Sequence, residues 1–542
     1  MNGEGSGEIA NKEPGGETAE ESDSSETKPR VRPRLFEYAE LPKWELYAYF
    51  AVLVGVFSYG IYCVVDVSTR VRELDVRTLG LWEMVEHPIF GTRIKDLTDW
   101  EWVHYHNFGF RLVPALMFHS LVFNLADHVP GQQIVKDIIR LSVSIIICAG
   151  VFGVSTVLIA VCCGLLIFGI TRTTRRLWCT WASALPALYI ALHYTESVAE
   201  NTENPLIPIL LMSYKVVAYL SYNIEFLHER NRKQDDNWQK CLFRMFCFAF
   251  YMPYGASIII LYPDFERQLE SRSTQTRNWK QLGLEAFRLA FWWWLLDTSL
   301  YFVYVGAILH AYDTLYVIRE DELVSFGWAV GQLFHLKYVI IFGIPRLFAK
   351  LDKMQPYPGP ICISRVALYS RIWRYFDRGL YSFFKEYIFL PLCRPTFSIP
   401  RKLLGLCMAY AFVLVWHGVE HNNLVWIALN VIELLMESCG KAIYSVESVR
   451  KFRENSISDL NFRRFLAWLY VVPLAFALYS NFYFLCGSEA GWIFVDRIFW
   501  GETYTLKYPF WLLISLGYCY CHVCIEMETW DEQKDAQKKK IE

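Results

Sequence analysis

The sequence predicts an all-α protein that crosses a membrane about 10 to 12 times and carries additional re-entrant or interfacial helices. Three observations predict this class. Of the 542 residues, 54% are apolar and 17% are aromatic. The apolar residues come in blocks close to the roughly 20 residues that a helix needs to span a bilayer. Charged connectors separate these blocks. A soluble helical core would not need so many apolar blocks of this length.

The blocks give the expected spans in order along the chain. They fall at residues 46–66, 112–127, 139–170, 177–195, 206–224, 241–262, 284–310, 323–348, 402–437, 464–486 and 508–526. The block at 139–170 is long enough for two short passes, and 402–437 is expected to hold two as well. The formal net charge is only −2. The chain therefore has no strongly basic surface that would indicate nucleic-acid binding.

The two ends of the chain differ from this pattern. Residues 1–40 predict a disordered acidic tail that ends in a basic run before the first span. The spans then define a domain over residues 41–527, and residues 528–542 predict a charged tail. Lys539 and Lys540 stand three and four places from the end, which matches a dilysine retention address. Basic flanks stay in the cytosol, so both termini are expected there.

The fifteen cysteines lie mostly inside apolar blocks. Their spacing gives no disulfide framework and no paired C-x-x-C metal site. Most are therefore interpreted as small apolar residues in helices.

Residues 351–400 differ from the spans because they are rich in proline, arginine and aromatic residues. Between residues 371 and 387, apolar side chains recur at three- and four-residue steps and form one stripe. Basic residues take the other faces. This pattern predicts one helix that lies in the interface or re-enters the membrane without crossing it.

The stretch VWHGVEHNN at residues 415–423 raises the question of the active site. His417, Glu420 and His421 form a literal H-x-x-E-H, the pattern of one class of zinc proteases. That chemistry requires both imidazoles on one helical face. Gly418 and the asparagines after His421 instead favour a bend between two spans. The alternative is a single functional histidine, with the zinc pattern a coincidence.

An ionisable residue at membrane depth is costly and is a functional candidate by default. The candidates are Arg111, His119, His193, Lys215, Asp297, His310, His335, Lys337 and His417. His417 differs from the others because it ends a clean apolar run and is followed by glycine. Polar residues inside spans would also suit a transporter.

Several stretches resemble one family, the membrane-bound O-acyltransferases, and within it the Hedgehog acyltransferase branch. They are LPKWELYAYF (41–50), FGIPRLFAKLD with PYPGPICIS (342–364), WRYFDRGLYSFFKEYIFLP (373–391), VWHG (415–418) and SNFYFLCG (480–487). The resemblance runs from about residue 41 to 526. One stretch departs from the family pattern, because Gly255 is followed by Ala-Ser where relatives have proline after the glycine.

The resemblance implies the fold and the chemistry. The helical bundle would enclose a catalytic tunnel, with His417 and Asp377 as the catalytic pair. The acyl donor would be palmitoyl-CoA, and the acceptor the N-terminal cysteine of a secreted Hedgehog-type signalling protein in the endoplasmic reticulum or Golgi membrane. Another membrane-bound acyltransferase, acting on a lipid or on a Wnt-type serine, is the alternative. Membrane lipids are expected partners, and nucleic acid is not.

The resemblance also implies binding residues. Trp373, Arg374, Tyr375 and Asn481 are expected to contact palmitoyl-CoA. Cys362 lies in a Pro-Gly-Pro-Ile-Cys stretch outside any expected span. It occupies the place where the branch carries haem b on a cysteine thiolate, a suitable axial ligand.

Overall fold

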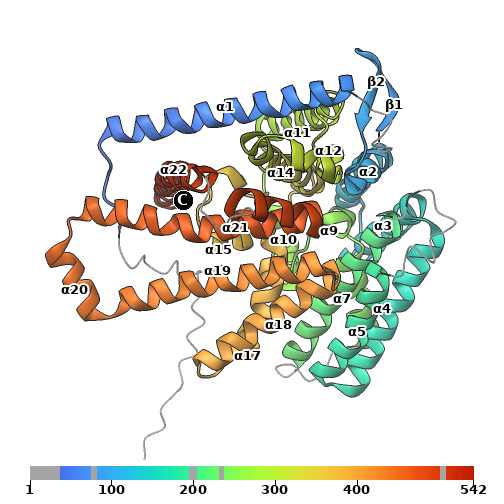
Figure 1. The fold of residues 1–542 in the computed structure, drawn as a ribbon. Coiled ribbons are helices and arrows are strands. Elements are labelled where there is room, and N and C mark those ends of the chain that lie inside the picture. Colours follow the sequence, from blue (N-terminus) through green and yellow to red (C-terminus); the bar gives the residue numbers. More distant parts are fainter. Residues whose placement is uncertain are drawn as a thin grey trace, which may run out of the picture. The chain divides into compact units, whose positions relative to one another are not determined.

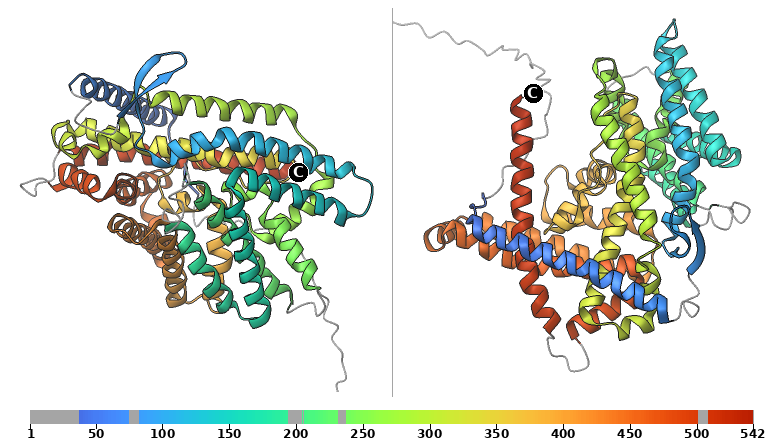
Figure 2. Two further views of the ribbon diagram at one scale, coloured as in Figure 1. Left: turned by 90° about the vertical axis from the view of Figure 1, so that its right-hand side faces the viewer. Right: turned by 90° about the horizontal axis from the view of Figure 1, so that it is seen from above.

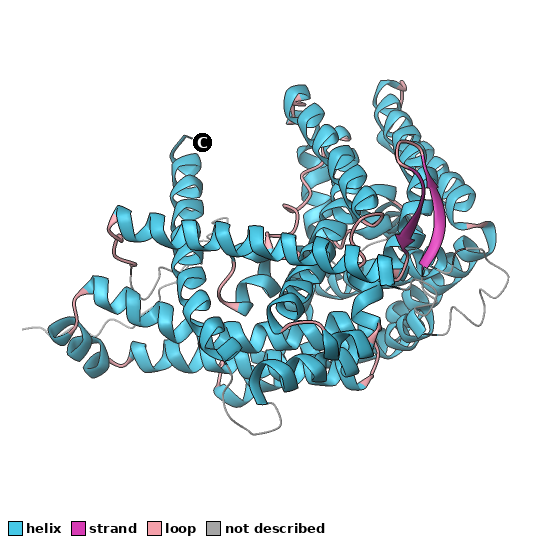
Figure 3. Cartoon of the chain, turned by 45° about the horizontal axis from the view of Figure 1, so that its top comes forward, coloured by secondary structure: helices cyan, strands magenta, loops and turns pink. Residues whose placement is uncertain are grey.

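The computed structural model describes residues 37–74, 82–193, 204, 206–230, 237–500 and 508–541. Residues Tyr38–Glu542 form one compact unit. The acidic tail expected at residues 1–40 lies outside the described residues, apart from its last four positions. Helices make up almost all of the described chain (Figure 3), which confirms the predicted all-α class.

One β-hairpin, β1 (Trp82–His87) with β2 (Gly91–Asp96), joins the first two long helices, and the sequence analysis did not predict it. The helices up to residue 310 are α1 (Lys43–Leu74), α2 (Trp100–Leu125), α3 (Gln133–Phe152), α4 (Val154–Thr174), α5 (Leu177–His193), α7 (Leu206–Arg230), α8 (Trp238–Ala249), α9 (Met252–Ser257), α10 (Tyr262–Ser271), α11 (Trp279–Ser299) and α12 (Val305–His310), with short 3₁₀ turns at Ala126–His128 and Arg272–Thr274.

The remaining helices are α13 (Tyr312–Val317), α14 (Glu320–Leu351), α15 (Tyr369–Tyr375), α16 (Arg378–Phe383), the π-helix η5 (Phe384–Phe389), α17 (Leu390–Cys393), α18 (Ile399–His417), α19 (His421–Ser445), α20 (Glu447–Ser456), α21 (Asp459–Val495), the π-helix η6 (Asp496–Trp500) and α22 (Tyr508–Ile541), with a 3₁₀ turn, η4, at Ile363–Arg365.

Within the described residues, nine helices are long and apolar enough to cross a membrane. They are α1, α2, α4, α7, α14, α18, α19, α21 and α22, some of them with adjoining residues. The protein is therefore a multi-pass membrane protein. The two long apolar blocks each hold two helices. Both helices of the second block, α18 and α19, are candidate spans, whereas in the first block α4 is one and α3 is not. Gly153 and Gly418 break the two blocks, each with a positive φ that favours glycine.

The span expected at residues 241–262 is absent from the described structure, which corrects the sequence prediction. This block holds the end of α8, all of α9 and the start of α10. Pro253 and Pro263 lie in the first turns of α9 and α10, where a missing N–H does no harm. Lys215 of α7 donates to the carbonyl of Ala249 at the end of α8, with an Nζ–O distance of 2.5 Å. The buried ammonium thus satisfies a helix end that the apolar surroundings would leave unpaired.

The single helix predicted for residues 371–387 is also corrected, because the chain breaks at Asp377. The Asp377 carboxylate accepts from the backbone N–H of Leu380 at 2.9 Å, so it caps the start of α16. A capping side chain requires non-helical backbone at its own position. The apolar stripe is therefore divided among α15, α16 and η5.

The predicted domain boundary at residue 527 falls inside α22, which continues to Ile541. Glu528 of this helix forms an ion pair with Arg371, and Asp531 pairs with Arg365 at 3.2 Å. The start of the expected C-terminal tail thus packs against the arginine-rich segment. The side chains of the expected dilysine signal, Lys539 and Lys540, lie outside the described residues.

The helices that carry the candidate residues lie next to one another. Helices α19 and α21 run side by side and are joined through α20 (Figure 1), and α18 packs against α19 and α5. Helix α15 contacts both α19 and α21. Helix α22 crosses close to α1 and α21, as the second view in Figure 2 shows. The segments at 373–377, 417 and 481 therefore approach each other although they are far apart in sequence.

Candidate active site

His417 is the last residue of α18, and its side chain is exposed. Gly418 follows with φ +96°, a conformation in which the helix cannot continue. The side-chain amide of Asn423 donates to the carbonyls of His417 and Gly418, at 3.0 and 3.1 Å. These two hydrogen bonds fix the end of α18. The His417 imidazole therefore occupies a defined position and keeps accessible surface.

The zinc interpretation of H-x-x-E-H conflicts with this geometry. His417 ends α18, whereas Glu420 caps α19 and His421 begins it. The His421 ring lies against the hydroxyl of Ser488, with an Nδ1–Oγ distance of 3.0 Å. The predicted bend between two helices is confirmed. Two histidines on either side of such a break do not form the one-face pair that this zinc chemistry needs.

Aromatic rings hold the His417 imidazole from two sides. Trp426 of α19 and Phe484 of α21 each contact it edge-on, with ring centroids 5.4 and 5.2 Å away. These two rings stack on each other at 4.2 Å. Trp373 stacks on the far side of Trp426 at 5.7 Å. The predicted residue Trp373 is therefore one ring away from His417.

Asn481 reaches the same cluster through hydrogen bonds. The Trp426 indole donates to the Tyr369 hydroxyl, and this hydroxyl lies 3.2 Å from the Asn481 Oδ1 that accepts from it. Tyr369 begins α15, the short helix that carries Trp373. Asn481 is thus linked to His417 by way of Tyr369 and Trp426, without touching it.

One face of α19 holds α15 in place. Asn430 accepts from the Trp373 indole N–H at 3.0 Å. Glu437 accepts from both the backbone N–H and the hydroxyl of Ser370, at 3.1 and 2.6 Å. Asn430 and Glu437 follow Trp426 by four and eleven positions, so the three side chains share one helical face. These contacts fix Trp373 relative to Trp426 and hence to His417.

Asp377 does not touch His417 among the described residues. Its carboxylate caps α16, and burial raises its pKa to about 6 against the opposing effect of the Leu380 and Gly379 N–H groups. The neighbouring Phe376 stacks on Phe334 at 5.6 Å, and Phe334 contacts Phe484 at 6.0 Å. A row of aromatic rings thus connects the two halves of the predicted pair. Among the described residues, no contact lets Asp377 orient the His417 imidazole directly.

Arginines surround Tyr375. The guanidinium groups of Arg371, Arg374 and Arg378 lie 5.6, 5.9 and 4.8 Å from the centre of its ring. Arg374 is exposed and also lies 5.9 Å from the ring of Tyr381. Guanidinium groups are the preferred partners of phosphate. The predicted residues Arg374 and Tyr375 therefore belong to a cationic group that can meet an anionic donor.

Cys362 carries an exposed thiol on a tethered loop. The backbone N–H of Ile361 donates to the carbonyl of Tyr375 at 3.1 Å, and Tyr520 of α22 bonds to the carbonyl of Ile363. Arg365, the last residue of the η4 turn, is paired with Asp531. An exposed thiol on such a loop is chemically suited to hold a haem iron as a thiolate. Among the described residues, no cluster of three or more His, Cys, Asp or Glu side chains could hold a metal ion.

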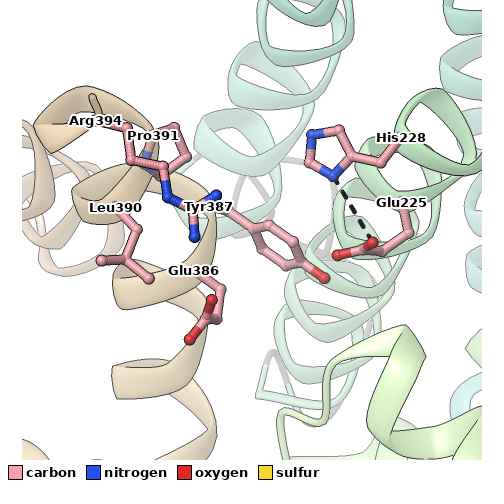
Figure 4. Close-up of a pocket in the computed structure, with 7 residues that line it drawn as sticks. All are labelled: Glu225, His228, Glu386, Tyr387, Leu390, Pro391 and Arg394. Atoms are coloured by element: carbon pink, nitrogen blue, oxygen red, sulfur yellow. Dashed lines mark ion pairs between the residues drawn. The ribbon is translucent and has the colours of Figure 1, made fainter. Parts of the chain in front are cut away.

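The pocket drawn in Figure 4 lies elsewhere, with a volume of about 240 Å³. It opens between the end of α7 and the segment formed by η5 and α17. Glu225 and His228 form an ion pair at 3.7 Å on one side of it, and Tyr387 points between the two walls. None of the predicted site residues lines it.

Sequence reasoning missed two neighbours of His417 and did not place His193 beside the end of the same helix, α18. Trp426 and Phe484 are aromatic residues among many in the apolar spans, so composition gave no signal for them. His193 was one of several buried-histidine candidates. Its Nε2 lies 2.9 Å from the carbonyl of Val415, two residues before His417. Only the packing of α5 against α18 reveals this proximity.

Comparison with known proteins shows which family the segment around the candidate site resembles. Residues 259–480 match the model of the membrane-bound O-acyltransferase family. This segment contains Trp373, Asp377 and His417. The match covers less than half of the chain, so it shows a similarity of this segment to the family.

Similarity to individual acyltransferases extends beyond that segment. The chain is 26% identical over 504 residues to protein-cysteine N-palmitoyltransferase HHAT of Mus musculus, covering 90% of this chain and 98% of the relative. It is 26% identical over 481 residues to protein-cysteine N-palmitoyltransferase Rasp of Drosophila melanogaster, covering 84% and 91%. Membrane-bound O-acyltransferase GUP1 of Candida tropicalis is 21% identical over 298 residues, covering 48% and 50%.

Proposed function

We propose that this protein transfers palmitate from palmitoyl-CoA to the α-amine of an N-terminal cysteine on secreted Hedgehog-type proteins. The observation that carries this proposal is the similarity to two protein-cysteine N-palmitoyltransferases over nearly their whole lengths. A weaker likeness to other O-acyltransferases covers only about half of the chain. The enzyme is therefore assigned to the protein-modifying branch.

The reaction needs a base at the acceptor amine. An α-amine has a pKa of roughly 8 and attacks a thioester only in its neutral form. In the proposed mechanism, His417 takes a proton from the attacking nitrogen and returns it to the departing CoA sulfur. An imidazole suits this relay because its ordinary pKa lies close to neutrality. Trp426 and Phe484 hold the ring so that little reorganisation is required.

Asp377 acts as a positioning residue in this proposal. Its carboxylate caps the helix that follows the Trp373–Tyr375 segment. Burial raises the pKa of this carboxyl group to about 6, and we assign the attracting role to its ionised form. That charge attracts the cationic peptide terminus toward the site.

The donor is assigned to the arginine-rich segment. The CoA phosphates would pair with the exposed Arg374 and with its neighbour Arg378. The pantetheine arm would then extend past Trp373, which would bring the thioester to His417. Asn481 supports this wall through Tyr369.

The orientation follows from charge. The basic residues at 172–176 precede α5, and Arg394, Arg401 and Lys402 flank the start of α18. Basic flanks stay cytosolic, so α5 and α18 would run toward the lumen and end there at His193 and His417. Both termini are assigned to the cytosol, and the dilysine tail to retention in the endoplasmic reticulum.

Haem b on Cys362 remains part of the proposal. When bound, the group would supply a redox-active iron, which the Cys362 thiolate would hold. Purified protein is expected to show a Soret band that Cys362→Ala removes and Cys439→Ala, at another exposed cysteine, keeps. Wild-type protein without Soret absorption would return Cys362 to the role of a small loop residue.

The direct test uses a peptide that begins with a free cysteine and its N-acetylated twin. Purified protein and labelled palmitoyl-CoA are expected to label the first peptide and leave the second nearly unlabelled, because only the first has an α-amine. Equal labelling of both peptides would indicate acylation of a thiol or hydroxyl. In that case an enzyme for a lipid or a Wnt-type serine becomes the better assignment.

A further inference from the structure

The proposed reaction releases one proton that His417 does not account for. At about pH 7 roughly 90% of α-amines carry a proton, because their pKa is roughly 8. His417 moves a proton from the attacking nitrogen to the CoA sulfur, which consumes only the proton lost during attack. The ammonium must lose its extra proton before that step. A second acceptor close to His417 would remove this limitation.

His193 is the second imidazole at this place. It ends α5, as His417 ends α18, and the two helix ends lie together. The Nε2 atom of His193 lies 2.9 Å from the carbonyl oxygen of Val415. A carbonyl can only accept, so Nε2 carries the hydrogen. In the neutral ring Nδ1 is then the atom with a free lone pair.

That lone pair lies beside the end of α18. A Cβ added to Gly418 would be 3.4 Å from Cε1 and 3.9 Å from Nδ1 of His193. Glycine at position 418, next to His417 in the chain, therefore leaves open the space beside the His193 ring.

The surroundings of His193 suit a group that alternates between neutral and charged forms. The side chain is half-buried. Its own helix presents Tyr189, whose ring centroid is 4.7 Å away, and α18 presents His417. Among the described residues of α4 and α7, which also pack against α5, no titratable side chain bonds to His193. In the part of the chain that the structure describes, no carboxylate forms an ion pair with His193.

We propose that His193 is a second base, which accepts the proton that the substrate's α-ammonium loses before His417 acts. This inference rests on the proposed function. The ammonium N–H bond breaks and an Nδ1–H bond forms, which leaves a neutral amine and an imidazolium. The amine then attacks the thioester, the C–N bond forms and the C–S bond breaks. His417 carries the second amine proton to the sulfur, and His193 releases its proton to lumenal water.

The alternative role for His193 is structural, because its hydrogen bond to Val415 satisfies a carbonyl in the last turn of α18. Two variants separate the roles. In His193→Gln the side-chain amide can still donate to this carbonyl but cannot take up a proton. In His193→Ala both capacities are lost. His421→Gln is the matched control, since that ring contacts Ser488 instead.

The measurement is kcat/KM for the cysteine peptide across about pH 6 to 9. For His193→Gln we expect a loss of about tenfold at pH 7, the reciprocal of the neutral amine fraction, and no loss at pH 9. His421→Gln should follow the wild type throughout. Equal activity of His193→Gln and wild type at pH 7, or a loss of the same size at every pH, would overturn the proposal.

A second acceptor keeps the test independent of folding defects. A peptide that carries an aminooxy group at its N-terminus is already uncharged at pH 7. It should be acylated equally well by the wild type and by His193→Gln, whereas a structural defect would slow both acceptors alike. If the wild type fails on the free-cysteine peptide itself, the proposed function is wrong. If the wild type succeeds and only the pH signature is missing, the assignment of His193 alone is wrong.

Discussion

At the scale of single residues, the site combines one accessible imidazole with a rigid aromatic frame. His417 gains its fixed position from Asn423 and from the rings of Trp426 and Phe484. None of these contacts removes the imidazole from its accessible position. The role of the imidazole therefore depends on which substrate groups reach it, while packing sets its orientation.

Asp377 allows the roles of charge and of capping to be separated. Asp377→Asn keeps an oxygen that can cap α16, so melting temperature should hardly change. Asp377→Ala should lose the cap and about 1 kcal/mol of stability. In the proposed mechanism both variants lose the negative charge that attracts the peptide, so kcat/KM for peptide should fall about tenfold or more in each. Full activity of Asp377→Asn at pH 7 would reduce the residue to a helix cap.

At the scale of helices and their ends, buried polar side chains form hydrogen bonds between helices that the apolar blocks did not predict. Asp352, just after α14, is fully buried. It accepts from the Tyr251 hydroxyl at 2.8 Å and from the Asn124 amide at 3.0 Å. Arg272 donates to its backbone carbonyl at 2.7 Å. These bonds join α2, α14 and the α9–α10 region into one unit.

The same residue predicts a pH dependence of stability. Burial raises the pKa of Asp352 from 3.8 to about 6. An acid whose pKa is raised in the folded state contributes its full stabilisation when the pH lies below the pKa of the unfolded chain. That contribution is lost as the pH rises through the folded pKa of about 6. The free energy of unfolding changes by about 3 kcal/mol between these two pH limits. Relative to Asp352→Asn, the wild type should therefore lose melting temperature between pH 4 and 7. Parallel curves for the two proteins would contradict the assignment.

The sequence predicted helices correctly where length and hydropathy were sufficient. It failed where the position of a helix end depended on a capping side chain or on prolines. The bend at Gly418 could be predicted because glycine and asparagine flank it. The break at Asp377 could not, because the apolar stripe from 371 to 387 continues across it and only the cap on Leu380 reveals the interruption. The block at 241–262 looked like a span because the prolines were outweighed by apolar residues.

The candidate site was predicted in part for a similar reason. Trp373 and Asn481 were expected from motifs, and both lie in the cluster around Trp426. Trp426 itself had no distinguishing pattern, since aromatic residues make up 17% of the chain. His193 lies more than 200 positions before His417, and no periodicity within one helix can indicate a contact between two helices.

At the scale of the whole molecule, location should depend on the C-terminal tail. Replacing Lys539 and Lys540 by Ser should let part of the protein leave the endoplasmic reticulum, because a dilysine address is read from the cytosol. Replacing Lys534, in the same helix, is the control and should leave the distribution unchanged. Fluorescence co-localisation measures both. A C-terminal tag that proves to be lumenal would contradict this prediction and the assigned orientation together.

The central claim is that His417 alone of the H-x-x-E-H residues performs amide-forming acyl transfer. The measurement is transfer from palmitoyl-CoA to a free-cysteine peptide by wild type, His417→Ala and His421→Ala, with palmitoyl-CoA affinity determined in parallel. Burial of the acyl chain contributes about 0.8 kcal/mol per CH₂, so affinity should be nearly unchanged. His417→Ala should lose 10²- to 10⁴-fold in rate, roughly the value of a general base, while His421→Ala stays close to wild type. Equal inactivation by both substitutions, together with zinc in the wild-type protein, would contradict the account.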